Sequence, residues 1–379
     1  MNNRVAYLDG IRACAALYVL IHHAFMTAYP DRITGVVPGW TGRVFGWAIW
    51  GHFGVTVFIV LAGYSLALGV AKHGGNLPGG FRGYMTKRSW RIIPAYWIAL
   101  AATIILSVTV IGTQTGTHWD QSAPSSPKGW LVDFLLLQDI VPVRNAAYTF
   151  WSISVEYHIY LLLPLMLLVW RRINWPAAIA AGVLVGVIGI VAAFGDERIW
   201  RLHPSYYLLF ALAAGACICT IQRPDIAVRI PWRSIGILCA ATGAATLWVF
   251  GYARTLDDYW WLDVLFGIAT ICLIVSMQLG RASSAEKVFN WRPFATASAF
   301  SYTLYLIHAQ LLQVFWQLVI RPFNLAATWQ LVLLWLVACP LIVLISWGAA
   351  RYMEAPFVRL AAKRSRTGTT LPGPVSEPR

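Results

Sequence analysis

The chain has 379 residues, of which 59% are apolar and only 12% are charged, and its mean hydropathy is +0.63. A soluble domain carries roughly 25% charged residues, so this composition excludes an ordinary soluble enzyme and favours a membrane protein. The net charge of +14 does not indicate nucleic-acid binding, because no basic cluster alternates with aromatic residues outside the loops that flank apolar segments.

Ten apolar stretches are long enough, or nearly long enough, to cross a bilayer as helices. In chain order they cover approximately residues 13–29, 53–70, 92–112, 152–169, 175–194, 205–221, 233–251, 260–279, 299–319 and 329–350. A further run at 130–141 is too short to span and contains Asp133 and Asp139, so we expect an interfacial or re-entrant segment. The predicted fold class is all-α: a polytopic transmembrane bundle of about ten helices.

Lysine and arginine are distributed unequally between the two sides of this bundle. When the N-terminus is placed in the cytoplasm, the inner segments collect 21 of the 29 Lys and Arg residues and the outer loops collect 8. Because positive charge favours the cytoplasmic side, we expect both the N- and the C-terminus to be cytoplasmic. Residues 1–362 then form one integral membrane domain, and residues 363–379, rich in Pro, Gly, Ser and Thr, form a disordered cytoplasmic tail.

The first apolar segment joins Arg12 to His23, eleven residues further on. Eleven residues of helix rise roughly 16 Å, so an arginine at one membrane face would be connected to a histidine near mid-membrane. Glu156 and His308 fall at compatible depths in other segments. Buried ionisable groups in membranes often mark functional paths, and histidine titrates near neutral pH, so His23 is a candidate general base. An interhelical hydrogen bond alone is the structural alternative.

A basic cluster follows the second apolar stretch, in a predicted inner loop: Arg82, Lys87, Arg88 and Arg91. Arg88 and Arg91 are three residues apart, so on a helix they would share a face. Two guanidinium groups on one face suit a phosphorylated ligand. By position alone, anchoring to lipid phosphates at the membrane surface is the simpler interpretation and is favoured over ligand binding.

Six blocks of residues occur in an order that resembles one protein family. They are Leu8-Asp9-Gly10-Ile11-Arg12 followed by His23, Gly54-Val55 … Phe58 … Gly63-Tyr64, Arg88-x-x-Arg91 with Pro94 and Tyr96-Trp97, Trp151-Ser152-Ile153-Ser154-Val155-Glu156 … Tyr160, Ser301-Tyr302-Thr303-Leu304-Tyr305-Leu306-Ile307-His308, and Glu354-Ala355-Pro356. Together they resemble the motifs of the acyltransferase-3 family, the bacterial integral membrane O-acyltransferases, in its stand-alone polysaccharide O-acetyltransferase type.

This resemblance implies an enzyme of the bacterial cytoplasmic (inner) membrane. It would transfer an acyl group, most often acetyl, from cytosolic acyl-CoA to a hydroxyl of a cell-envelope or exported glycan. The partners would be acyl-CoA, the hydroxyl acceptor and the lipid bilayer, without nucleic acid. The thioester supplies the driving force, so neither a metal nor a permanently bound cofactor is expected.

The resemblance also implies roles for individual residues. Arg12, Arg88 and Arg91 would bind the phosphates of acetyl-CoA. His23 would act as general base or carry the acyl group transiently, and Glu156 would position or polarise that histidine or the acceptor. Further substrate contacts are expected from Trp151, Ser152, Tyr305 and His308.

Two alternatives remain open at the level of the sequence. Within the same family, the acceptor could be a lipophilic natural product such as a macrolide. In a different class, the chain could be a proton-coupled transporter that uses His23, Glu156 and His308 as a proton relay. The chain shows no matching pair of broken helices in its two halves, which disfavours the transporter.

Overall fold

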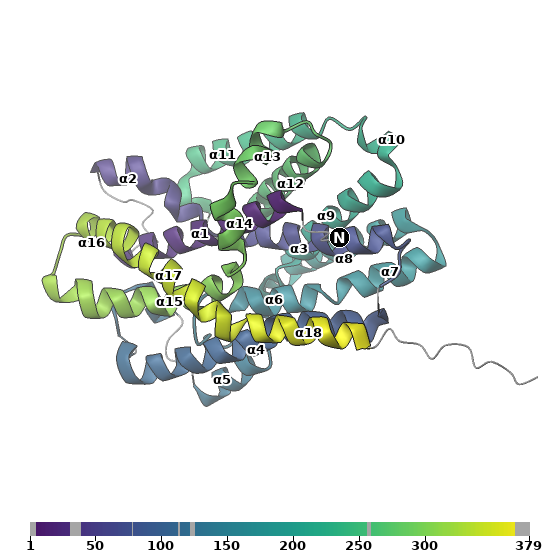
Figure 1. The fold of residues 1–379 in the computed structure, drawn as a ribbon. Coiled ribbons are helices and arrows are strands. Elements are labelled where there is room, and N and C mark those ends of the chain that lie inside the picture. Colours follow the sequence, from purple (N-terminus) through teal and green to yellow (C-terminus); the bar gives the residue numbers. More distant parts are fainter. Residues whose placement is uncertain are drawn as a thin grey trace, which may run out of the picture.

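The computed structural model describes residues 5–30, 39–77, 79–112, 114–121, 126–255 and 259–367, and in these ranges every regular element is helical (Figure 1). The α-helices are α1 (Ala6–Ala28), α2 (Gly39–Phe45), α3 (Phe53–Lys72), α4 (Gly80–Leu106), α5 (Pro127–Phe134), α6 (Trp151–Ile159), α7 (Leu162–Arg172), α8 (Trp175–Gly195), α9 (Pro204–Gln222), α10 (Pro224–Ala227), α11 (Trp232–Thr255), α12 (Tyr259–Gln278), α13 (Ser283–Phe289), α14 (Arg292–Ser298), α15 (Ser301–Phe315), α16 (Ala327–Leu333), α17 (Cys339–Met353) and α18 (Ala355–Thr367). Short 3₁₀ or π segments connect or extend them: η2 (Gly46–Trp50), η3 (Ser107–Ile111), η4 (His118–Gln121), η5 (Glu197–Leu202), η6 (Trp316–Ile320), η7 (Arg321–Phe323) and η8 (Leu334–Ala338).

Ten segments of the described chain are long and apolar enough to cross a membrane, which confirms the predicted polytopic bundle. They are Ala6–Ala28, Trp40–Lys72, Gly80–Ile111, Trp151–Arg172, Trp175–Gly195, Pro204–Gln222, Trp232–Gly251, Trp260–Gln278, Ser301–Phe323 and Ala327–Ala361. The helices lie roughly side by side, and the N-terminus and α10 are at one end of the bundle, with α2 and α16 at the other (Figure 1). We call the end where α1 begins the N-terminal face.

The largest difference from the predicted spans is the start of the third one. The basic cluster that was expected in a loop belongs to α4, which begins at Gly80. Lys87, Arg88 and Arg91 are good helix formers, so the helix continues past the apolar run. Toward the N-terminus the helix extends as far as Gly80, and the preceding Gly79 has a left-handed backbone with a φ of +78°.

Helix α1 occupies the middle of the bundle, where it packs against α3, α14 and α15, while α3 packs against α9 (Figure 1). Glycines permit close approaches on both sides of α3. A Cβ at Gly51 would lie 2.1 Å from His22 Cβ, and a Cβ at Gly63 would lie 2.5 Å from the carbonyl oxygen of Phe210. Close packing of glycine against a neighbouring helix is a frequent device in membranes, and here it holds α3 against both α1 and α9.

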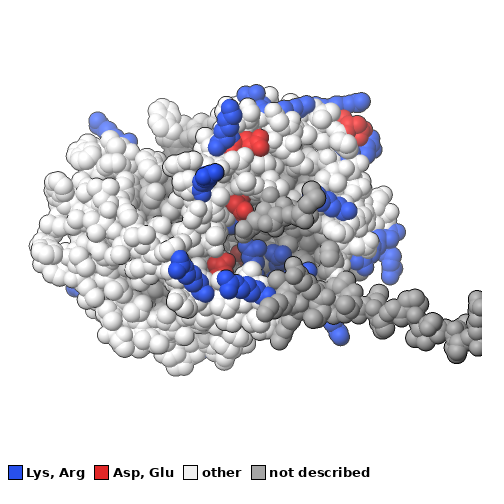
Figure 2. Space-filling view, in the orientation of Figure 1, with Lys and Arg blue, Asp and Glu red and all other residues white. Residues whose placement is uncertain are grey.

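Charged side chains are concentrated near the N-terminal face. Figure 2 shows most of the visible Lys and Arg atoms on the side where the N-terminus lies in Figure 1, whereas the opposite end is mostly uncharged. The short run at 130–141 contains α5 and a turn rather than a span. Helix α18 extends to Thr367, and the rest of the predicted tail lies outside the described residues.

Candidate active site

Helix α1 carries both Arg12 and His23 and brings them to two different cavities. Arg12 lies near its start, where Nη1 donates to Asp9 Oδ1 at 2.9 Å, a pair on one helix face at i and i+3. His23 lies three turns further on, close to the far end of the helix. The two side chains thus sit at different depths of the same element.

Arg12 lines a narrow cavity of about 70 Å³ toward the N-terminal face, which we call the arginine cleft. Its polar walls come from α1, α4, α6, α15 and the junction between α17 and α18. They include Arg12, Arg91, Glu156, Ser152, Ser301, Tyr302, Tyr305 and Glu354. The sequence-predicted Arg12, Arg91, Glu156, Ser152 and Tyr305 are therefore brought together here from helices far apart in the chain.

Arg88 borders this cleft from the same helix as Arg91. Its guanidinium lies 5.9 Å from the ring centroid of Tyr160, whose hydroxyl donates to Glu156. The positive charge of Arg91 repels those of both Arg12 and Arg88, and the carboxylate of Glu156 attracts both of these arginines. Arg88 Nε is buried and has no hydrogen-bond partner among the described residues. Since an unpaired buried donor is costly, the cluster suits an incoming anion.

His23 lines a second cavity, of about 220 Å³, which we call the histidine pocket. Its walls combine imidazole, phenol and indole rings from α1, the start of α3, η4 and the start of α6. Among them are His22, His23, His52, His118, Gln121, Tyr148, Trp151 and Tyr305. The pocket offers both hydrogen-bonding groups and flat aromatic faces to a ligand.

His23 is held by a direct contact with His308 on α15. The two nitrogens, His23 Nδ1 and His308 Nε2, are 2.8 Å apart. His308 is buried, and its Nδ1 lies 2.8 Å from the carbonyl oxygen of Tyr305 and 3.1 Å from that of Leu304. A carbonyl oxygen only accepts, so Nδ1 of His308 carries the hydrogen, and Nε2 of the neutral ring accepts.

The same logic fixes the tautomer of His23. Because His308 Nε2 accepts, His23 Nδ1 must donate, and the neutral ring keeps its lone pair on Nε2. The network thus assigns Nε2 of His23 as the basic nitrogen. In many enzymes a carboxylate holds the base in this way. Glu156 lies instead with the arginines.

Trp151 forms the aromatic wall of the histidine pocket through a stack of rings. Its indole lies 4.3 Å, centroid to centroid, from His203, and 6.0 Å from His52. His203 lies between two spans, where burial, together with the charge of His52, lowers its pKa to about 3. That ring is therefore neutral at physiological pH and stacks as an uncharged aromatic surface.

Tyr305 and Val55 line both cavities and form the partition between them. The hydroxyl of Tyr305 lies 2.6 Å from Ser152 Oγ and donates to the carbonyl oxygen of Thr149 at 3.2 Å. A direct path from the arginine cleft to His23 thus passes the side chains of Tyr305 and Val55.

A histidine–carboxylate pair lies beside the histidine pocket, which His52 lines, and was not assigned from the sequence. His52 Nε2 lies 3.4 Å from Asp263 Oδ1 and 3.1 Å from the Tyr206 hydroxyl, and Thr56 donates to the same carboxylate. These residues lie at or near the outer ends of three predicted spans, where solvation is the simplest interpretation. Only the three-dimensional packing shows that they meet.

His118 and Tyr148, from the long connection between the third and fourth spans, complete this wall. The Tyr148 ring centroid lies 5.0 Å from that of His23 and 4.5 Å from that of His118. Among the described residues, no group of three or more His, Cys, Asp or Glu side chains is placed to hold a metal ion.

The sequence of this chain matches a known protein family. A family model described as an acyltransferase domain matches residues 5–351. The chain therefore belongs to this acyltransferase family.

Three curated relatives are similar to the chain at low identity. It is 22% identical over 343 residues to YrhL of Bacillus subtilis, named as a candidate peptidoglycan O-acetyltransferase, covering 83% of this chain and 51% of the relative. It is 21% identical over 328 residues to the peptidoglycan O-acetyltransferase OatA of Listeria monocytogenes, covering 80% and 49%. The chain thus spans about half the length of these two relatives.

A third relative is similar over nearly the whole length of both chains. The acyltransferase MdmB of Streptomyces mycarofaciens is 22% identical over 402 residues, covering 99% of this chain and 96% of the relative. No solved structure matches the chain.

Proposed function

We propose that this protein transfers an acyl group, most simply acetyl, from acyl-CoA bound in the arginine cleft to a hydroxyl of an acceptor in the histidine pocket. One observation carries the proposal: the two cavities adjoin at Tyr305, and a base with an assigned lone pair lines the second one. The protein would act in the cytoplasmic membrane, with the N-terminal face toward the cytosol.

The donor's phosphates would bind the three guanidinium groups. Arg12 and Arg91 line the cleft, and Arg88 contributes its unpartnered buried Nε. Arginine forms bidentate hydrogen bonds with phosphate, which a lysine does not match. The thioester end would then extend toward Tyr305 and the histidine pocket. The cleft is narrow, so binding would require the Tyr305 side chain to move.

The chemistry is a proton transfer coupled to acyl transfer. Nε2 of His23 takes the proton of the acceptor hydroxyl while its oxygen attacks the thioester carbonyl carbon. The carbon–sulfur bond then breaks, and the CoA thiolate takes that proton from the imidazolium, so atoms and electrons balance. Direct attack by the same Nε2, giving a transient acyl-histidine, requires the same tautomer.

The acceptor that the pocket suits best is a sugar hydroxyl of a cell-envelope or exported glycan. Trp151 and Tyr148 offer aromatic faces, and His52, His118 and Gln121 offer polar atoms. The names of YrhL and OatA support a peptidoglycan acceptor. A lipophilic natural product such as a macrolide is a second candidate acceptor. MdmB, the relative that aligns over nearly the full length of both chains, is named as an acyltransferase, and its name mentions no glycan.

In the experiment, labelled acetyl-CoA is added to membranes that contain the full chain. CoA release is measured, and mass spectrometry follows the label into glycan and lipid pools. We expect turnover in the wild type and its loss in His23→Ala. Arg88→Ala and Arg91→Ala should raise KM for acetyl-CoA, whereas Arg82→Ala, an exposed arginine of the same helix outside the cleft, should not. Proton-coupled uptake without CoA release would instead identify a transporter.

A further inference from the structure

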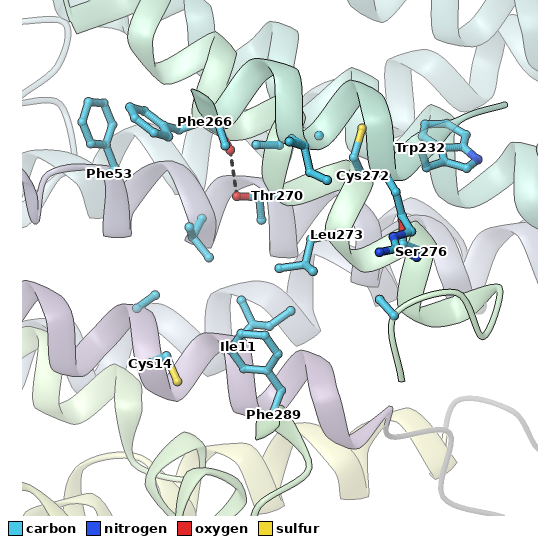
Figure 3. A pocket seen from close by; sticks show the side chains of 18 of the residues that line it. Ile11, Cys14, Phe53, Trp232, Phe266, Thr270, Cys272, Leu273, Ser276 and Phe289 are labelled. Carbon is cyan, nitrogen blue, oxygen red and sulfur yellow. Dashed lines mark hydrogen bonds between the residues drawn. The ribbon is translucent and has the colours of Figure 1, made fainter. Parts of the chain in front are cut away.

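A third cavity opens on a different stripe of α1 and has no part in the proposed reaction. It has a volume of about 610 Å³ and lies between α1, α3, α11 and α12; we call it the lateral pocket. In Figure 3, Ile11 and Leu273 point toward each other across it, with Phe53 at one end and Trp232 at the other. Its size lies within the range of real small-molecule sites, roughly 300–1,000 Å³.

The depth of the lateral pocket corresponds to one leaflet of a bilayer. Along α12 its lining runs from Phe266 to Ser276. Ten residues of helix rise about 15 Å, which is half of a hydrocarbon core of about 30 Å. Ser276 is close to the N-terminal face, since α12 ends at Gln278. The pocket therefore begins at that face and ends near the middle of the membrane.

The lining of the lateral pocket favours an apolar ligand over water. Most side chains around the pocket offer only carbon or sulfur, and the polar atoms of three of the others already donate to main-chain carbonyl oxygens: the Thr270 hydroxyl to Phe266 (Figure 3), the Tyr18 hydroxyl to Trp47 and the Trp232 indole to Ala227. Arg233 and Ser276 are the remaining polar side chains of the lining. Cavities of this kind stay dry and accept apolar ligands. An unfilled void of this size would forfeit many dispersion contacts. A hydrocarbon chain is the ligand that the surrounding bilayer supplies.

One end of the lateral pocket is basic. Trp232 and Arg233 begin α11 at the N-terminal face, and the Arg233 side chain is exposed there. Tryptophan prefers the membrane interface, and one basic side chain at that level favours an anionic lipid about fivefold. The long wall is open to lipid as well, because only 6% of the α11 span is buried.

We propose that the lateral pocket binds one anionic phospholipid from the leaflet at the N-terminal face. One of its acyl chains lies between α11, α12 and α1, and its phosphate lies at Arg233. The lipid would then complete the packing behind α1, the helix that carries Arg12 and His23.

Photo-crosslinking tests this binding without any acyl-transfer assay. The full chain is placed in phosphatidylcholine vesicles that contain a trace of phosphatidylglycerol with a diazirine in one acyl chain. After illumination, labelled peptides are quantified by mass spectrometry. We expect labels on the pocket faces of α11 and α12, and about fivefold fewer from a phosphatidylcholine probe with the same diazirine chain.

Two matched pairs of variants locate the site. Ala240→Trp fills the pocket, whereas Leu238→Trp places the same bulk on the lipid-facing side of α11. Arg233→Gln removes the charge at the mouth, whereas Arg229→Gln removes an exposed charge outside it. Labelling should fall several-fold in the first member of each pair and stay unchanged in the second.

Two results would overturn the proposal. Equal labelling by the two lipid probes would remove the role of the anionic headgroup, and labelling that survives both pocket variants would remove the site. Should Ala240→Trp fail to fold, judged by size-exclusion chromatography, the surface variant Arg233→Gln still decides. Either failure leaves the proposed acyl transfer standing, since no catalytic readout is involved.

Discussion

The contact between His23 and His308 replaces the carboxylate that usually holds a catalytic histidine. A neutral imidazole fixes the tautomer of its partner as a carboxylate does, but it brings no full negative charge to stabilise the imidazolium. Nδ1 of His308 in turn donates to main-chain carbonyl oxygens of its own helix, at Tyr305 and Leu304. The basicity of His23 would thus depend on the backbone geometry of α15.

We predict that His308→Ala lowers kcat by about 10²-fold, within the range of general acid–base effects, and leaves KM for acetyl-CoA unchanged. Without an acceptor at Nδ1, His23 would sample the tautomer whose Nε2 is protonated. His308→Gln, whose amide oxygen can accept from Nδ1, should recover part of kcat. His22→Gln is the control, because His22 Nδ1 lies 2.9 Å from the main-chain carbonyl oxygen of Ala48, whereas His308 Nε2 contacts His23. A raised KM with normal kcat would instead indicate a binding role for His308.

At the residue scale, the sequence could predict which side chains are unusual but not which of them meet. His23 and His308 are ionisable residues in apolar segments, and their depths follow from helical rise. Their contact joins positions 285 residues apart. It depends on how α15 is rotated about its own axis against α1, which tertiary packing decides. The same is true of Glu156, which was expected near His23 or the acceptor and lies beside Arg12, Arg91 and Tyr160.

At the scale of elements, the short helix α5 is fixed to α4 through its carbonyl oxygens. The Tyr96 hydroxyl donates to the Asp133 oxygen at 2.9 Å, and the Trp97 indole donates to the Phe134 oxygen at 3.0 Å. The Asp133 side chain is buried; one carboxyl oxygen accepts from the Ala146 amide at 2.7 Å, and the other has no partner among the described residues. Burial raises the pKa of Asp133 to about 7, and the amide hydrogen bond opposes this in part.

This shift predicts that stability falls as pH rises. The folded pKa of Asp133 is raised from 3.8 to about 7, so between these values the folded state holds a proton that the unfolded state has lost. The contribution of Asp133 is thus complete below pH 4 and is lost as pH rises to about 7, by at most about 1.4 kcal/mol per pH unit. Thermal unfolding of the detergent-solubilised protein from pH 5 to 8 should show this slope in the wild type and a flatter one in Asp133→Asn. Identical slopes would contradict the assignment.

The elements themselves were largely predictable because each apolar run encodes its own span. The residues at which the helices begin and end were harder to predict. The basic cluster at Lys87–Arg91 was expected in a loop, since hydropathy marks where a chain leaves the bilayer and does not mark where a helix ends. Helix propensity extends the N-terminal end of α4 back to Gly80, next to the cap residue Gly79. This extension puts Arg88 and Arg91 on a rigid helix face beside the arginine cleft.

At the scale of the whole molecule, the two cavities lie in series along α1. The arginine cleft opens from the N-terminal half, the histidine pocket lies beyond Tyr305, and the partition between them is a pair of side chains. Composition and span number defined the bundle from the sequence alone. The cavities could not be predicted in this way, because each is formed by residues from at least four separate segments. How each helix is rotated about its own axis relative to its neighbours cannot be deduced from a local sequence pattern.

The orientation of this arrangement decides whether the donor can reach it, and it leads to a topology prediction. Ten spans, with most positive charge on the N-terminal face, predict that this face lies in the cytosol. Ser283 is exposed after the eighth span, on the N-terminal face, and Glu197 is exposed after the fifth, on the opposite one. A membrane-impermeant maleimide should label Glu197→Cys in intact cells and Ser283→Cys only after permeabilisation. The six native cysteines lie in apolar spans, so the wild type gives the background.

The reverse labelling pattern would turn the arginine cleft away from the cytosol. Acyl-CoA is made and kept in the cytosol, so an outward-facing cleft would have no donor, and His23 would face the wrong pool of acceptors. The three guanidinium groups would then be better explained as ligands for an external anion. Topology is thus the one whole-molecule measurement on which the direction of acyl transfer depends, and it can be made before any acceptor is known.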